Sequence, residues 1–120
     1  MRLQTEIKEW FPWPDDPDGA EVLIRHLRSG EIENIMDRTR EITVRDGETV
    51  IRMNGTHEAA IVAAISDWKK FYGDDGKELP CTPGNIRKKC REDGFMPQID
   101  AFRIDLAARN KVDPGADQKN

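Results

Sequence analysis

The sequence lacks the features that direct a chain to nucleic acid or to a membrane. Its formal net charge is −4 over 120 residues, so no overall positive field attracts a nucleic acid. No apolar run approaches the ~20 residues that cross a bilayer. The N-terminal segment also lacks the apolar core of a signal peptide. We therefore expect a cytoplasmic protein without membrane association, for which nucleic acid is a disfavoured partner.

The motifs of common enzymes are missing as well. The sequence contains no P-loop, dinucleotide fingerprint, HExxH motif or nucleophile elbow. His57 stands beside Glu58 at the expected start of a helix, where the helix dipole disfavours a protonated imidazole. The carboxylates of the acidic loop at residues 12–19 lack the ligand spacing of an EF-hand. We expect no enzyme activity, no catalytic or metal-binding residue, and no cofactor.

Cysteine is scarce, with only Cys81 and Cys90 in the chain. In a cytoplasmic protein both are expected to be reduced. Cys90 follows Ile86 by one helical turn, which favours a small core residue. The spacing alone leaves a disulfide open as the alternative. Together with His26 and His57 the two cysteines match no zinc pattern.

The residues that are present favour one polar folded domain. Hydrophobic residues make up 37% of the chain and charged residues 35%, while three Trp and four Phe argue against full disorder. We expect a single α+β domain over residues 1–112. The segment 113–120 is expected to be a disordered polar tail.

The N-terminal half carries the strand patterns. Alternation predicts strands over residues 3–11 and 21–27, separated by a proline-rich and aspartate-rich loop. A short helix is expected after Ser29, its predicted N-cap. Ile32, Ile35 and Met36 would form the apolar stripe of this helix.

Residues 41–53 carry the strongest hairpin pattern. Asp46-Gly47 suits a two-residue type I′ turn. This turn sets Arg45 opposite Glu48, Val44 opposite Thr49 and Ile42 opposite Ile51. The apolar side chains Ile42, Val44, Ile51 and Met53 then share one face, and a shift by one residue would divide them between both faces.

A long helix is expected next, from the N-cap Thr56 to Lys70. Ile61, Ile65 and Trp68 recur at helical spacing within it. Trp68 is interpreted as a core residue at the helix end, with an exposed recognition residue as the alternative. After a turn at residues 74–76, Thr82 and Pro83 predict the N-cap and first turn of a third helix, which Gly94 would end.

The fourth helix is expected from Met96 to about Arg109. Ile99 and Phe102 lie on one side of it, and Ile104 lies roughly opposite at 100° per residue. A helix that is apolar on two sides is either wedged within its own domain or covered by a partner. We take the second possibility as the binding hypothesis. The residues expected at the protein-binding surface are Trp68, Phe71, Phe95, Ile99, Phe102, Ile104 and Leu106.

These patterns together predict an α+β fold. A small antiparallel sheet from the N-terminal half would be packed by about four helices, mainly from the C-terminal half. The basic cluster Arg87, Lys88, Lys89 and Arg91 could contact phosphate, but on a short helix of an acidic protein it is interpreted as a solvated face.

The run ISDWKKFYGDDGKELPCTPGNIRKKCREDGF, together with DPDGAEVLIRHLRSGEIENI, resembles the tail assembly chaperones of long-tailed bacteriophages and prophages. The shared features are a D-W pair, an acidic D-x-G turn, an L-P step and a T-P-x-N helix start. They fall at Asp67-Trp68, at residues 74–76, at Leu79-Pro80 and at residues 82–85. Gly84 and Cys81 depart from this pattern, and the resemblance covers roughly residues 15–108.

The resemblance implies a non-enzymatic role in the cytoplasm of a bacterial host. Such chaperones coat the tape-measure protein before the tail tube forms, and the tail tube protein is a second expected partner. A homo-oligomer is compatible with this role. The alternatives are another phage structural protein, such as a head–tail connector or tail completion protein, and a small regulatory nucleic-acid-binding protein.

Overall fold

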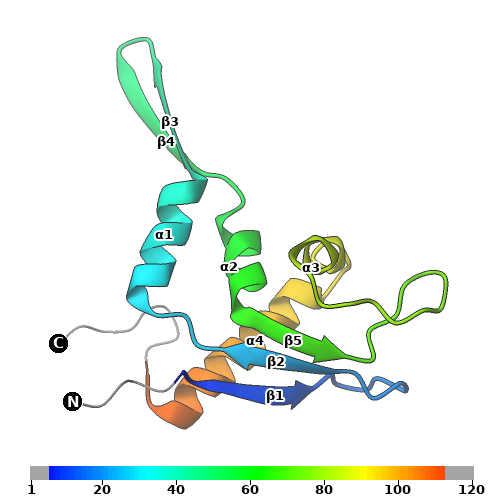
Figure 1. The fold of residues 1–120 in the computed structure, drawn as a ribbon. Helices are drawn as coiled ribbons and strands as arrows, with labels where there is room; N and C mark the ends of the chain where they lie inside the picture. Colours follow the sequence, from blue (N-terminus) through cyan, green and yellow to red (C-terminus); the bar gives the residue numbers. More distant parts are fainter. Residues whose placement is uncertain (1–5, 113–120) are drawn as a thin grey trace.

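The computed structural model describes residues 6–112, which form four helices and five strands (Figure 1). The predicted polar tail and the first residues of the predicted N-terminal strand lie outside this range. The elements are, in chain order, β1 (Lys8–Pro12), β2 (Glu21–Arg25), α1 (Ser29–Thr39), β3 (Arg40–Arg45), β4 (Glu48–Met53), α2 (Thr56–Ala64), β5 (Ile65–Lys69), α3 (Pro83–Lys89) and α4 (Phe95–Asn110). The α+β class is confirmed.

The main sheet has three antiparallel strands in the order β1-β2-β5. The central strand β2 directs Val22 and Ile24 into the core, where both are fully buried. Helix α4 packs against β2 and β1, so it covers this apolar face of the sheet. The ring of Phe102 on α4 stacks on Phe11 of β1 with 4.9 Å between centroids. Burial of these apolar surfaces is the main force that holds helix and sheet together.

The long helix predicted from Thr56 to Lys70 is wrong in its second half. Helix α2 ends at Ala64, and the chain continues directly as β5. The pairing places Ile65 opposite Ile24 and Trp68 opposite Val22, with an irregularity that skips Ser66. This bulge turns two residues at a spacing of three toward the same core. A bulged strand therefore reproduces the apolar spacing of a helix over this short segment.

Three predicted helix ends also need correction. Helix α1 has Arg28 rather than Ser29 at its N-cap, and Gly55 rather than Thr56 precedes α2. Gly94 does not end the third helix, which ends at Lys89. It is the N-cap of α4, with a φ of 84° that glycine adopts without strain. The predicted start of α3 is confirmed, because the Thr82 side chain accepts a hydrogen bond from the Asn85 amide at 3.2 Å.

The predicted hairpin is confirmed in its turn and its register. Asp46 and Gly47 have φ values of 54° and 80°, as a type I′ turn requires. Arg45 lies opposite Glu48, and Ile42 lies opposite Ile51. The two strands form a separate sheet that projects from the ends of α1 and α2, away from the rest of the domain (Figure 1). We call residues 40–53 the arm.

Two substitutions on α4 test which of its faces supports the fold. Phe102→Ala should lower the free energy of unfolding by about 3–5 kcal/mol, because it removes a buried ring and leaves a cavity. Ile104→Ala on the exposed face should change it by no more than about 0.5 kcal/mol. Urea unfolding of both variants measures the difference. Equal losses would show that both faces of α4 are packed.

Candidate functional site

The structure places six of the seven residues of the predicted binding surface inside the domain. These are Trp68, Phe71, Phe95, Ile99, Phe102 and Leu106. They belong to the hydrophobic core that α4 forms with the main sheet. Ile104 differs, because 59% of its surface is exposed. A binding role for the six would require the core to open, whereas most of the exposed large apolar side chains lie elsewhere, in residues 42–53.

Trp68 illustrates why these aromatic residues are held in place. Its ring stacks on Phe71 with 4.5 Å between centroids, and its indole N–H donates to the Leu79 carbonyl at 2.8 Å. The apolar body is buried and the polar end is satisfied, as expected for a core tryptophan. The core interpretation of Trp68 is therefore confirmed, but on a strand rather than at a helix end.

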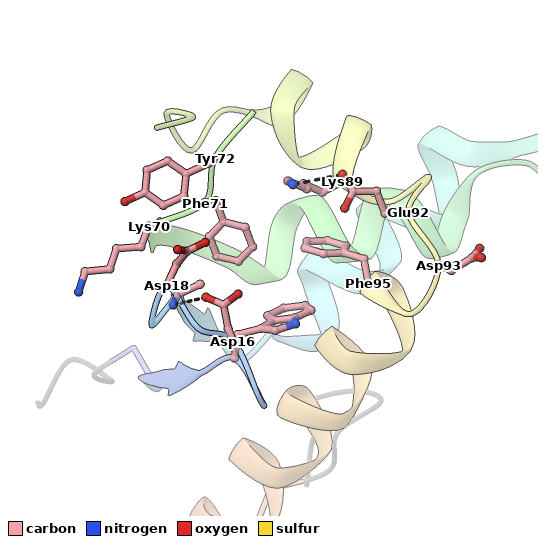
Figure 2. Close-up of a pocket in the computed structure, with 11 residues that line it drawn as sticks. Asp16, Asp18, Lys70, Phe71, Tyr72, Lys89, Glu92, Asp93 and Phe95 are labelled. Atoms are coloured by element: carbon pink, nitrogen blue, oxygen red, sulfur yellow. Dashed lines mark hydrogen bonds and ion pairs between the residues drawn. The ribbon is translucent and has the colours of Figure 1, made fainter. Parts of the chain in front are cut away.

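One shallow hollow lies where the acidic loop, the segment that follows β5, the end of α3 and the start of α4 meet (Figure 2). Its volume is about 260 Å³, and Trp13, Phe71 and Phe95 contribute aromatic walls. Charges of both signs surround it, and Lys89 pairs with Glu92 at 3.1 Å. Within residues 6–112, no three His, Cys, Asp or Glu side chains are grouped as metal ligands. Because carboxylates and lysines both line the hollow, its charge favours neither an anionic nor a cationic ligand.

The basic cluster on α3 is partly neutralised by carboxylates. Arg87 contacts Glu58 of α2 at 2.9 Å, and Lys89 contacts Glu92. Each contact lies on the surface and ties α3 to its surroundings. These pairs reduce the positive charge that a phosphate backbone would meet.

Both cysteines are free thiols, so the disulfide alternative is not realised. Burial, with a smaller contribution from the charge of Asp67, raises the pKa of Cys81 to about 11. Burial also raises the pKa of Cys90. Both thiols therefore stay protonated at neutral pH, which makes them poor nucleophiles.

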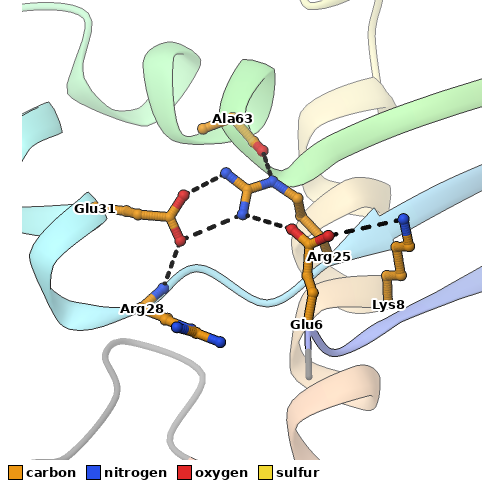
Figure 3. Close-up of polar contacts among 6 residues, drawn as sticks. All are labelled: Glu6, Lys8, Arg25, Arg28, Glu31 and Ala63. Atoms are coloured by element: carbon orange, nitrogen blue, oxygen red, sulfur yellow. Dashed lines mark hydrogen bonds and ion pairs between the residues drawn. The ribbon is translucent and has the colours of Figure 1, made fainter. Parts of the chain in front are cut away.

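Arg25, at the end of β2, joins three parts of the domain (Figure 3). Its Nε donates to the Ala63 carbonyl of α2 at 2.9 Å, and its guanidinium contacts Glu6 and forms a two-pronged pair with Glu31 of α1. Glu31 also accepts from the Arg28 amide at 3.0 Å. This network fixes the first turn of α1 to the sheet and to α2.

Packing between α1 and α2 fixes the base of the arm. Leu27, Ile35 and Ala64 form a small buried cluster between α1 and α2. The hydroxyls of Thr39 and Thr56 lie 2.7 Å apart, where α1 leads into the arm and α2 leaves it. The arm therefore projects from two helices that are packed on each other.

The arm itself is the most exposed apolar part of the described structure. All its strand residues are exposed, and no other sheet pairs with it in the part of the chain that the structure describes. One face collects the large apolar side chains that the hairpin prediction had grouped: Ile42, Val44, Ile51 and Met53. The half-exposed Met36 of α1 continues this face toward the domain. We call these five residues the arm face.

A hollow of about 330 Å³ lies where the arm face meets α1. It is lined by Glu33, Met36, Asp37, Arg40, Ile51 and Met53. Methionine side chains adapt their shape to a bound apolar group. An isolated two-stranded ribbon is only marginally stable in water, so an uncovered apolar face on it indicates a binding surface.

The sequence predicted the four residues of the arm face that belong to the hairpin, but not where this face lies in the molecule. Met36 was assigned instead to the apolar stripe of its helix, and it is half-exposed. The alternation and the Asp-Gly turn identified the shared apolar side, but an amphipathic hairpin normally packs on its own domain. Only the separation of the two sheets, visible in the structure, shows that nothing in the described chain covers it.

Comparisons with protein families, with curated proteins and with solved structures gave no match to this chain. The described helices include none that combines the length and the apolar character of a membrane span.

The Arg25 network makes stability depend on pH in a defined direction. The hydrogen bond from Arg25 lowers the pKa of Glu31 below its usual 4.5. A lowered pKa stabilises the fold above pH 4.5, and this contribution is lost as the pH falls through the lowered value. Glu31→Gln should therefore destabilise the protein at pH 7, and its difference from wild type should shrink below pH 4.5. Urea unfolding across this range measures it.

Glu33→Gln on the same helix is the matched control, because Glu33 is exposed. It should leave the pH dependence of wild type unchanged. A Glu31→Gln difference that stays constant from neutral to acid pH would contradict the assignment of this network.

Proposed function

We propose that this protein is a non-enzymatic tail assembly chaperone that binds the tape-measure protein through the arm face. The observation that carries the proposal is the exposure of this face in a domain whose other large apolar groups are mostly packed internally. The resemblance to tail assembly chaperones in residues 15–108 supports the choice of partner. The proposed location is the cytoplasm of the bacterial host.

The arm face suits an amphipathic helix, which is the structure expected of a tape-measure segment. Such a helix covers an apolar surface with side chains at intervals of three and four residues. The hollow between α1 and β4 could receive one of them at the base of the arm. The opposite face of the arm carries Glu41, Arg45, Glu48 and Arg52, so the bound complex keeps a charged exterior.

The net charge of −4 supports the same role. The negative charge of each copy would keep the complex with the client soluble. We propose the tail tube protein as a second partner, as the same resemblance implies. The regulatory nucleic-acid-binding alternative is weaker, because Arg87 and Lys89 already contact carboxylates.

Substitutions on the arm test the proposal directly. Ile42→Asp and Ile51→Asp should each reduce capture of the co-expressed tape-measure protein by at least about tenfold, because a charge would be buried without a partner. Both residues are exposed in the free protein, so unfolding should change little. A quantitative pull-down measures capture.

Ile104→Asp is the matched control, since Ile104 is equally exposed but lies on α4. It should capture the tape-measure protein as wild type does. Loss of capture with Ile104→Asp, and not with the arm variants, would move the binding surface to α4. Presence of the chain in purified virions would instead favour a connector or tail completion protein.

A further inference from the structure

The arm has two open edges as well as an open face. Its sheet contains only β3 and β4 among residues 6–112. Strands at an edge present unpaired N–H and C=O groups, to which another strand can bond. The Asn54 amide donates to the Thr39 carbonyl at 2.8 Å, so Thr39 and Asn54, which face each other at the base of the arm, are a hydrogen-bonded pair of the ladder. Because bonded and non-bonded pairs alternate, the outward N–H and C=O groups of β3 belong to Arg40, Ile42 and Val44.

These outward groups restrict how β3 can pair with β3 of a second copy. In an antiparallel pair, outward residues must face outward residues. When Ile42 faces Val44 of the second copy, Glu41 faces Arg45, and the twofold axis repeats both contacts. The neighbouring registers set Glu41 or Arg45 opposite uncharged residues. One register therefore matches backbone, charge and apolar groups together.

This register also extends the pairs that already exist within each arm. Glu41 lies opposite Arg52, and Arg45 lies opposite Glu48. Across the joined sheet, the charges of each such row would alternate in sign over all four strands. On the other side, Ile42 would lie beside Val44 of the second copy and join the two arm faces.

The β4 edge offers a weaker alternative. It also has a charge-matched register, with Glu48 facing Arg52, but this register sets Thr49 against Ile51. The β3 edge instead covers Val44 and Ile42, which at 72% and 60% are the most exposed of the large apolar residues described. Burial of apolar surface therefore favours β3.

We propose that two copies of this chain pair through the β3 edges of their arms. The strands run antiparallel about a twofold axis at Thr43 and form a four-stranded sheet. The inference does not rest on the proposed function, because it requires no second kind of protein.

Sedimentation velocity of the full chain at increasing concentration tests the pairing. Wild type should reach twice its 13.7 kDa. Glu41→Arg alone and Arg45→Glu alone should each remain at 13.7 kDa, because like charges then face each other on both sides of the axis. An equimolar mixture of the two variants should regain the double mass, because every facing pair across the axis then joins an arginine of one chain to a glutamate of the other.

Glu48→Arg is the matched control. It loses the same pair within the arm as Arg45→Glu does, but lies on the strand away from the second copy. It should therefore reach the double mass, as wild type does. A monomeric wild type, a mixture that stays monomeric, or a Glu48→Arg variant that loses the double mass would each overturn the proposal.

Discussion

Strand β2 is hydrogen-bonded on both edges, to β1 and to β5, and α4 covers its apolar face. Val22 and Ile24 have no exposed surface as a result. The bonding on the β5 side depends on the chain leaving a helix at Ala64 and continuing at once as a strand. Without β5, the backbone of β2 would present an open edge beside the core.

This packing buries most of the apolar surface of the C-terminal half. Phe95, Ile99 and Leu106 all lie on the side of α4 that meets the core. The opposite side keeps Ile104 as its one large exposed apolar residue, which is ordinary for a surface helix. The larger exposed apolar surface lies on the arm instead. The Arg25 network holds the first turn of α1, while the packing of α1 on α2 and the contact between Thr39 and Thr56 hold the base of the arm. Within residues 6–112, the two strands of the arm pair only with each other.

The sequence revealed local structure more reliably than it revealed exposure. The register of the hairpin was predictable to the residue, because the Asp46-Gly47 turn and the apolar alternation specify the same register. The start of α3 was predictable from Thr82 and Pro83 for a similar reason. Ile65 and Trp68 misled the prediction, because the bulge in β5 gives a strand the spacing of a helix.

Exposure depends on contacts between distant segments, which local patterns do not contain. The stripe on α4 was correctly identified as apolar, but its cover comes from Phe11 and from β2, far earlier in the chain. The arm shows the reverse case, since its apolar face resembles that of any hairpin on a core. The stripe of α4 that was expected to bind a partner is buried, and the apolar face of the hairpin is exposed, because the arm forms a sheet of its own.

Hydrogen–deuterium exchange of the free chain and of its complex with the tape-measure protein, at one protein concentration, tests the central claim most directly. The claim is that the accessible binding surface is the arm and not α4. It predicts that amides of residues 40–53 exchange more slowly in the complex, while those of β2 and α4 are unchanged. Slower exchange confined to residues 95–110, with the arm unaffected, would contradict it.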